Sequence, residues 1–340
     1  MSENAPVGIG VIGCDHRHAY GMLQGLLDAG AQARAWWTDG EPPPAEGFRK
    51  RFPQVARVDH RRAILDDPAV QLVIIAAVPD QRAALAIEAM EAGKDVMVDK
   101  PGCTTLEDLA RLQAAVARTG RIWSVDFSEH FEVPAVTAAL DLVRAGTIGR
   151  VVQTVGLGPH RHNPHTRSPW FYEPARSGGI LCDIGSHQID QFMAFTGSTE
   201  VEIVSASSGN HATPAHPAFE DFGQMLLRGN GGEGYIRVDW YTADALPTWG
   251  DGRLFVLGTE GTIELRKYVD VAGRAGTDHL FLVNGSRCEY IDASGAELPY
   301  FARLLDDVRR RTETAMSQAH CFSVTSLALR AQQMAQRRGA

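Results

Sequence analysis

Two hydrophobic patterns alternate along the first hundred residues. Short, nearly continuous apolar runs are typical of buried parallel strands, and they occupy residues 7–12, 33–37, 70–78 and 95–98. Apolar residues at helical spacing fill the intervals, at residues 19–29, 45–52 and 81–92. Strands that alternate with helices in this way predict an α/β fold, a doubly wound parallel sheet.

The pattern changes in the second half of the chain. Runs with strand character follow one another at residues 151–157, 201–205, 221–227, 234–240 and 253–257, and Asn230-Gly231-Gly232 indicates a hairpin turn. Helical patterns close the chain at residues 298–312 and 321–338. We therefore expect two domains, residues 1–124 and 125–340, the second an α+β domain with an open sheet.

Composition narrows the class of protein. The chain has 340 residues, and its 44% hydrophobic content is typical of a globular protein. Its formal charge of −8 argues against nucleic acid, a polyanion, as the main partner. The five cysteines are scattered without a C-x-x-C pair, as in cytoplasmic proteins. The apolar run at residues 7–12 is too short to span a membrane and lacks a basic leader, so we expect a cytoplasmic protein with no membrane partner.

Candidate binding residues follow the predicted parallel strands. Ligands of such sheets bind beyond the carboxyl ends of the strands, where the sequence places Gly13, Asp39, Val78-Pro79 and Lys100. Asp39 is a candidate for a ribose hydroxyl and would disfavour a 2′-phosphate, although Thr38 competes for that position. Lys100, followed by Pro101, can stabilise alkoxide charge; the alternative is an exposed surface lysine.

An incomplete dinucleotide-binding fingerprint follows the first predicted strand. Only Gly13 of the pattern G-x-G-x-x-G is present, because Asp15 and His18 stand at the other two glycine positions. A carboxylate is unfavourable beside a pyrophosphate. Asp15, His16 or His18 either contacts the cofactor or substrate, or the histidines are ordinary loop residues with internal partners.

A second candidate site lies in residues 177–190. Gly178-Gly179 precedes a helical pattern on which Asp183 and His187 stand at i and i+4, so both leave one helix face. An imidazole beside a carboxylate suits proton transfer, and the glycines would let a ligand approach the backbone. The plainer interpretation is an ion pair on a helix surface.

Five segments resemble known motifs: residues 99–101, 125–134, 145–151, 177–190 and 258–264 resemble E-K-P, V-G-F-x-R-R-F-x-P, S-G-x-L-G-R-V, G-G-G-x-L-x-D-x-G-x-H-x-x-D and G-T-E-G. In the same order, these are motifs of the Gfo/Idh/MocA family, the glucose–fructose oxidoreductase and inositol dehydrogenase group, which the chain therefore resembles. The chain departs from the family at Asp15, His18, Asp99, Asp126 and Ala83, where many members have two glycines, a glutamate, a glycine and a histidine.

The resemblance implies a Rossmann domain followed by a domain with a large, mostly antiparallel open sheet. It implies NAD, or NADP, as cofactor, a sugar or cyclitol substrate, and catalytic roles for Lys100, Asp183 and His187. We expect cofactor contacts from Gly13, Asp15, His16, Asp39, Val78, Pro79, Lys100 and Pro101. We expect substrate contacts from His130, His160, His162, Trp170, Asp183 and His187.

The Pro-broken loop at residues 158–172 is the remaining cluster of polar and aromatic groups. It could line a sugar site, with aromatic stacking and histidine donors. His160, His162 and His165 could instead bind zinc, but no cysteine accompanies them, and we predict no metal. Another loop, residues 247–253 around Trp249, could approach a substrate in the same or a neighbouring subunit.

We predict an NAD(P)-dependent dehydrogenase that transfers hydride between nicotinamide and a secondary hydroxyl. One alternative is a relative that cleaves glycosides by transient oxidation and elimination, and another is a nucleotide-sensing regulator without chemistry. Strand-rich segments with outward aromatics predict a homodimer or homotetramer.

Overall fold

The chain folds into two compact units, each assembled from separate segments. The computed structural model describes residues 5–339. Unit 1 contains the described residues up to Asp126, Thr166–Gly178 and Pro299–Thr325; unit 2 contains Phe127–His165, Gly179–Leu298 and the described residues from Ser326. The chain first passes from unit 1 to unit 2 after Asp126, two residues beyond the boundary expected between residues 124 and 125. The two later segments of unit 1 were not expected from the sequence.

Unit 1 is built on a six-stranded parallel sheet with the order β3-β2-β1-β4-β5-β6. Its strands are β1 (Gly8–Cys14), β2 (Gln32–Trp37), β3 (Ala56–Arg57), β4 (Leu72–Ala76), β5 (Asp95–Asp99) and β6 (Trp123–Asp126). Every residue of β1, β4, β5 and β6 is buried. Both faces of the sheet are therefore covered, as the continuous apolar runs predicted.

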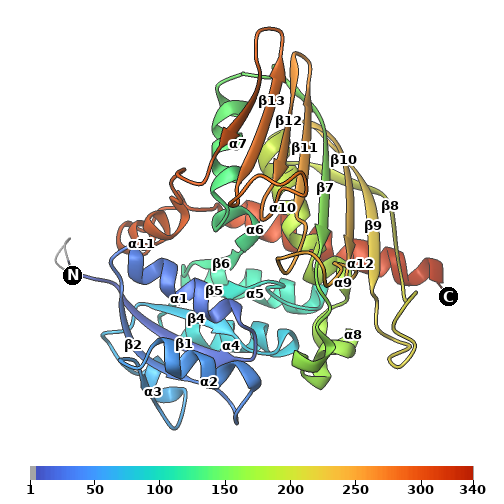
Figure 1. Ribbon diagram of the computed structural model, residues 1–340. Coiled ribbons are helices and arrows are strands. Elements are labelled where there is room, and N and C mark those ends of the chain that lie inside the picture. The colour runs from blue at the N-terminus through green and yellow to red at the C-terminus, as the bar shows by residue number, and fades with distance from the viewer. Residues whose placement is uncertain (1–4, 340) are drawn as a thin grey trace. The chain divides into compact units, whose positions relative to one another are not determined.

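Helices connect these strands (Figure 1). They are α1 (His18–Asp28), α2 (Pro43–Arg51), α3 (Arg62–Leu65), α4 (Pro79–Glu91) and α5 (Leu106–Thr119). The later segments of unit 1 add α8 (Pro174–Ser177), α11 (Tyr300–Arg310) and a 3₁₀ turn, η2 (Pro169–Tyr172). Helix α5 was missed in the sequence, although its ends carry ordinary signals. The side chain of Thr105 accepts a hydrogen bond from the amide of Asp108, and Gly120 ends the helix in the left-handed conformation.

Unit 2 is built on an eight-stranded sheet with the order β14-β13-β12-β11-β7-β10-β9-β8. Its strands are β7 (Val151–Pro159), β8 (Val201–Gly209), β9 (Phe222–Gly229), β10 (Gly232–Asp239), β11 (Arg253–Gly258), β12 (Gly261–Arg266), β13 (His279–Asn284) and β14 (Cys288–Asp292). Only β7 and β10 pair in parallel. The antiparallel sheet is confirmed, and β12 to β14 extend it beyond the strands that the sequence pattern indicated.

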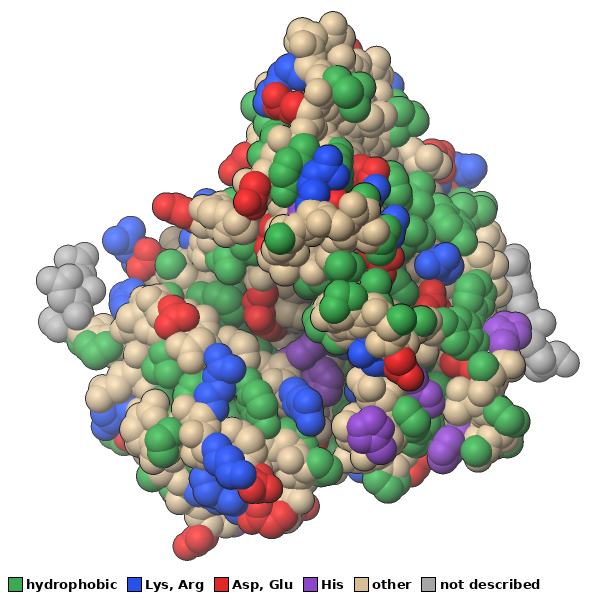
Figure 2. Space-filling view, viewed as in Figure 1, with side chains coloured by type: hydrophobic (Ala, Val, Ile, Leu, Met, Phe, Trp, Pro, Cys, Tyr) green, Lys and Arg blue, Asp and Glu red, His purple; other side chains and the backbone are tan. Residues whose placement is uncertain are grey.

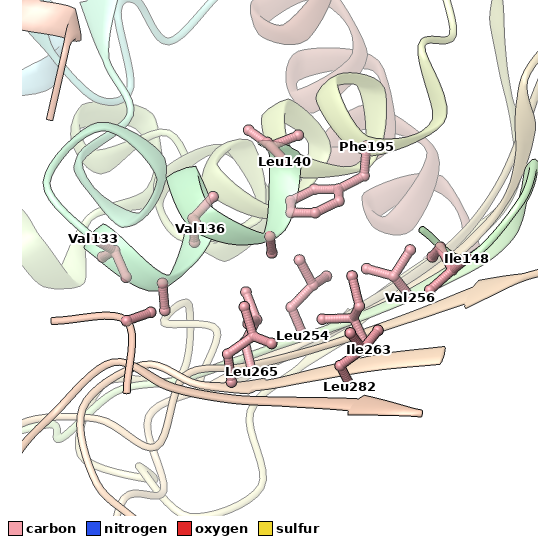
Figure 3. Close-up of a cluster of buried hydrophobic side chains, with 14 of the residues drawn as sticks. Val133, Val136, Leu140, Ile148, Phe195, Leu254, Val256, Ile263, Leu265 and Leu282 are labelled. Carbon is pink, nitrogen blue, oxygen red and sulfur yellow. The ribbon is translucent and has the colours of Figure 1, made fainter. Parts of the chain in front are cut away.

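One face of this sheet packs against helices. The helices of unit 2 include α6 (Ser128–Phe131), α7 (Pro134–Arg144), α9 (Ile180–Asp183), α10 (Gly185–Thr196) and most of α12 (Gln318–Gly339), with the turn η1 (Pro164–Thr166) at its border. Val136 and Leu140 of α7 and Phe195 of α10 meet inward residues of the strands, such as Leu254 and Leu282 (Figure 3). This cluster is the core of unit 2.

The opposite face of the same sheet is apolar but exposed. Paired residues form one row across eight strands: Ser205, Leu226, Tyr235, Val155, Phe255, Glu264, Phe281 and Tyr290. Leu226 is 44% exposed, and Phe255 and Tyr290 are also exposed. Inward neighbours such as Met225 and Val256 are buried, so the period of two along each strand separates a core face from an open one.

No described helix is both long and apolar enough to cross a membrane. Figure 2 shows acidic and basic side chains interspersed over the viewed face, without a broad area of one sign.

Candidate functional site

The carboxyl ends of β1 and β4 meet where the strand order of unit 1 reverses, the usual ligand position in such sheets. Gly13 adopts φ +81°, and a Cβ there would lie 2.5 Å from the backbone of Ala77. The amides of Asp15 and His16 both donate to the carbonyl of Ala76, at 3.0 and 3.3 Å. Gly13, the only glycine of the fingerprint that is present, therefore lets the loop after β1 pass close to the end of β4. The amides of Asp15 and His16 in this loop are hydrogen-bonded within the protein.

The end of β2 presents Asp39. Thr38 is buried, and its hydroxyl accepts a hydrogen bond of 3.0 Å from the amide of Cys14. Asp39 is exposed. Of the two residues that competed for the ribose position, Thr38 is thus engaged in joining β2 to β1, and Asp39 has the accessible carboxylate.

Asp15 has an unusual charge state. Burial raises the pKa of its carboxyl to about 6; the positive charge of Arg82 opposes this shift, and the negative charges of Asp39 and Asp80 add to it. The group therefore changes charge close to neutral pH, at the place where the family pattern has a glycine.

A fully buried carboxylate, Asp99, gathers the polar groups at the end of β5. His16 Nδ1 lies 2.8 Å from its Oδ2, His18 Nδ1 2.8 Å from its Oδ1, and Arg82 Nη2 2.8 Å from its Oδ2. Burial alone would raise the pKa of Asp99, but the charge of Arg82, followed by those of both histidines, holds it well below its ordinary value. Burial lowers the pKa of His16 to about 4. At neutral pH a neutral His16 therefore donates its Nδ1 proton to an ionised Asp99.

Arg82 also holds the segment that carries Lys100. Its Nε donates to the carbonyl of Ala77, and its Nη1 lies 2.9, 2.6 and 3.0 Å from the carbonyls of Asp99, Lys100 and Pro101. Lys100 is only 3% exposed, so it is not the surface lysine of the alternative interpretation. Val78, Pro79 and Pro101 are buried as well.

The sequence interpretation missed Arg82. It stands at the buried positions of α4, in register with Pro79, Ala83, Ala86 and Met90. An arginine in an apolar helical stripe must be paired or hydrogen-bonded. The position of Arg82 in this stripe was the sequence signal that could have identified it as a buried, hydrogen-bonded residue.

In unit 2, Asp183 and His187 belong to two short helices and not to one. Helix α9 ends at Asp183 and α10 begins at Gly185, with Ile184 as the junction. The prediction of a single continuous helix was wrong in this detail. His187 is 1% exposed, and its ring meets the edge of Phe127 with 6.4 Å between ring centres. Asp183 is half-buried.

Gly179 makes room for a protein side chain and not for a ligand. A Cβ at Gly179 would lie 2.4 Å from the amide carbon of Gln332. Gln332 Oε1 accepts from the amide of Leu181, its Nε2 donates to Glu220, and Glu220 accepts from the amide of Ile180. The first turn of α9 is therefore closed by side chains of unit 2, contrary to the expectation that its backbone stays open for a ligand.

A buried ion pair lies beside His187. Lys267 Nζ and Gln188 Nε2 each lie 2.8 Å from Glu129 Oε2. Lys267 is 0% and Glu129 2% exposed. Burial would raise the pKa of Glu129, but Lys267, then His187 and His160, outweigh it and lower that pKa strongly. Neither Glu129 nor Lys267 was singled out in the sequence; a glutamate in place of the family's arginine at residue 129 was the available signal.

His160 faces the same ion pair. Its Nδ1 donates to the carbonyl of Gly158 at 3.2 Å, and its Nε2 lies 3.8 Å from Glu129 Oε1. The loop of Trp249 reaches this histidine within unit 2: the two ring centres are 4.5 Å apart, and the amide of Arg161 donates to the carbonyl of Trp249.

The other predicted substrate residues have contacts of their own. His130 Nδ1 bonds Asp190 Oδ2 at 2.7 Å, and His162 stacks on Phe219 with ring centres 5.3 Å apart. Trp170 belongs to unit 1, in η2. Among the described residues, His160, His162 and His165 do not form a group with metal-binding geometry.

Comparisons with known proteins agree with this architecture. Residues 5–127 match the model of an oxidoreductase family with an NAD-binding Rossmann fold, and residues 136–264 match that of the GFO/IDH/MocA C-terminal domain. A crystal structure of a putative oxidoreductase from Erwinia carotovora atroseptica is 44% identical, with a TM-score of 0.93 over 97% of this chain and 98% of that one.

More distant relatives have named activities. The scyllo-inositol 2-dehydrogenase (NAD⁺) of Bacillus subtilis is 28% identical over 70% of this chain and 68% of its own length. A levoglucosan dehydrogenase in complex with NADH and levoglucosan has the same fold, with 22% identity and a TM-score of 0.76 over 99% of this chain and 98% of that one. The chain spans only about half the length of several curated relatives, 52%, 49% and 61% of three of them.

Proposed function

Because the chain belongs to the Gfo/Idh/MocA family of NAD-binding oxidoreductases, we propose that it oxidises a secondary hydroxyl of a sugar or cyclitol, or reduces the matching ketone. The observation that carries the proposal is the buried Lys100, held by Arg82 at the carboxyl end of β5. The substrate class is taken from the relatives that act on scyllo-inositol and levoglucosan.

The cofactor would lie along the carboxyl ends of β1, β2 and β4. Gly13, Asp15 and His16 would border its phosphates, Asp39 its ribose, and Val78 and Pro79 its nicotinamide half. The exposed Asp39 fits two ribose hydroxyls and repels a 2′-phosphate, which favours NAD over NADP. Bound there, NAD supplies the carbon that accepts or returns the hydride.

The protein's own groups would handle the proton and the developing charge. Lys100 donates a hydrogen bond to the reacting oxygen and stabilises it as an alkoxide. His187 takes the hydroxyl proton during oxidation, and Asp183 orients the substrate or the imidazole. His187 lies close enough to Glu129 for their charges to interact, since it contributes to the lowered pKa of Glu129.

A screen of sugars and cyclitols for NADH formation tests the reaction. With a substrate in hand, we expect Lys100→Ala and His187→Asn to lower kcat about 10²- to 10⁴-fold while NADH binding stays nearly unchanged.

Oxidation by the wild type should rise with pH through an apparent pKa near that of an imidazole, about 6.5 before perturbation. His187→Asn should flatten that rise. His211→Asn, an exposed histidine of unit 2, is the matched control.

The screen also separates the alternatives. Product formation without net NADH release would indicate cleavage by oxidation and elimination. Tight NADH binding without turnover of any substrate would indicate a nucleotide-sensing regulator. Normal turnover and an unchanged pH profile in His187→Asn would show that another group is the base.

The open face of the eight-stranded sheet supports a further part of the proposal, a homo-oligomer. Leu226, Phe255 and Leu257 are each at least 36% exposed on this face, an arrangement that a second copy could cover. Light scattering should find a dimer or tetramer for the wild type and a smaller species for Phe255→Lys. A monomeric wild type at working concentration would contradict this.

A further inference from the structure

The strongest unexplained feature of the molecule is the convergence of two imidazoles on one buried carboxylate. One ligand atom from each of His16, His18 and Asp99 lies within 4.8 Å of the other two, and no other such group occurs among the described residues. The two histidines use different oxygens of Asp99. They are 23% and 30% exposed, whereas the carboxylate is fully buried.

We propose that His16, His18 and Asp99 form a binding site for a divalent first-row metal ion, of which Zn²⁺ is the best match. Two imidazole nitrogens and one carboxylate oxygen are a donor set that zinc and ferrous sites use, with the remaining position left to water or another ligand. This site lies in unit 1 and goes beyond the proposed dehydrogenase reaction.

Arg82 determines which carboxylate oxygen is available. Its Nη2 bonds Asp99 Oδ2, and its Nε and Nη1 lie within hydrogen-bond distance of four backbone carbonyls. Oδ2 therefore keeps an outer-shell partner, and Oδ1 is the ligand oxygen. Such outer-shell bonds fix the orientation of a ligating carboxylate. Asp15 is near enough to Arg82 for their charges to interact, which offsets part of the guanidinium charge.

The local geometry needs only a small adjustment. A tetrahedral ion with bonds of about 2.0–2.1 Å separates its ligand atoms by about 3.3 Å. His18 Nδ1 lies 2.8 Å from the ligand oxygen Oδ1, so this histidine would move outward by about half an ångström. His16 Nδ1 lies 2.8 Å from Oδ2, so its ring would shift from that oxygen toward an ion bound at Oδ1. His16 lies in the turn before α1, His18 is the first residue of that helix, and both are half-buried. Two Nδ1–H bonds to Asp99 would be replaced by metal–ligand bonds, with the imidazole protons moving to Nε2.

The competing description is a triad held by hydrogen bonds alone, and glutamine variants distinguish the two. His16→Gln and His18→Gln each keep an N–H that can reach Asp99 but lose the nitrogen lone pair that binds metal. His60→Gln changes an exposed histidine of the same unit and is the matched control. Circular dichroism and thermal melting establish that each variant is folded.

The test is calorimetric titration of EDTA-treated, full-length protein with Zn²⁺, with Co²⁺ absorption as a second probe. We expect one Zn²⁺ per chain, intense cobalt d–d bands of a four- or five-coordinate ion, and binding at least about 100-fold weaker in His16→Gln and His18→Gln. The control should bind like the wild type. Absence of stoichiometric binding, unchanged affinity in both variants, or a pale six-coordinate cobalt spectrum would each overturn the proposal.

Discussion

Two buried carboxylates, one in each unit, are stabilised in different ways. Asp99 shares its oxygens among Arg82 and two half-exposed histidines, and each oxygen has at least one partner. At Glu129, Lys267 and Gln188 both donate to Oε2, and Oε1 has no hydrogen-bond partner among the described residues. The first carboxylate has three side-chain partners within hydrogen-bond distance, whereas the second is hydrogen-bonded to a single cation, Lys267. Loss of a partner should therefore be far more costly at Glu129.

The largest effect should follow from Lys267→Met. This change leaves Glu129 charged, buried and unpaired, which costs about 3–5 kcal/mol of unfolding free energy. Urea unfolding measures it. Glu129→Gln combined with Lys267→Met should recover most of the loss. Lys50→Met, which breaks an exposed pair with Glu46, should cost less than about 0.5 kcal/mol. A similar small cost for Lys267→Met would show that Glu129 does not depend on it.

A smaller loss is expected from Gly156→Ala. The added Cβ would lie 2.7 Å from Gln188 Oε1, and Gln188 cannot turn away freely because its Nε2 holds Glu129. Overpacking of this kind costs about 1–3 kcal/mol. Gly285→Ala, where the new Cβ meets nothing within 4 Å, should stay within about 0.5 kcal/mol of the wild type. Equal unfolding midpoints for the two variants would contradict the role given to Gln188.

Asp15 should make cofactor binding depend on pH. The pKa of this carboxyl is raised to about 6, so it is neutral below that pH and negative above it. Since a negative Asp15 would repel the phosphates, NADH should bind more weakly as the pH rises through 6. At pH 8, Asp15→Asn should tighten binding about tenfold, or about 1.4 kcal/mol, and should flatten the pH dependence. Fluorescence titration measures both, and a weaker complex in Asp15→Asn would count against this placement of the phosphates.

Of the changes at the two carboxylates, His16→Gln should have the smaller effect on stability. Arg82 and His18 still hold Asp99, and the glutamine amide can replace the lost donor, so the cost should stay below about 1 kcal/mol. A loss as large as that of Lys267→Met would remove the contrast between the two carboxylates.

The sequence predicted those features that depend on local pattern. Continuous apolar runs identified the central strands of unit 1, and the end of such a run placed Lys100 at the carboxyl edge of the sheet. Helix–strand alternation and the family motifs predicted both sheets. The break between Asp183 and Gly185 escaped because the apolar spacing continues through it.

Long-range partners could not be predicted. Lys267 pairs with Glu129 across 138 positions, and Gln332 reaches the amide of Leu181 across 151. No hydrophobic periodicity in the sequence relates residues that lie so far apart. The glycine at residue 179 therefore suggested an open backbone, when it in fact accommodates a side chain from the last helix. Arg82 was different, because its place in a buried stripe was visible in the sequence.

The segmented construction of unit 1 has a consequence for protein synthesis. Its edge strand β6 is completed by late residues: Gln318 bonds both the amide and the carbonyl of Trp123, and Phe322 stacks on the Trp123 ring with centres 5.3 Å apart. The first of these partners, Gln318, lies 195 positions later in the chain. At a translation rate of about 5–20 residues per second, the strand would wait roughly 10–40 s on the ribosome before its cover is made. During that interval a nascent-chain chaperone, or any other unpaired strand, would find this edge of the sheet accessible.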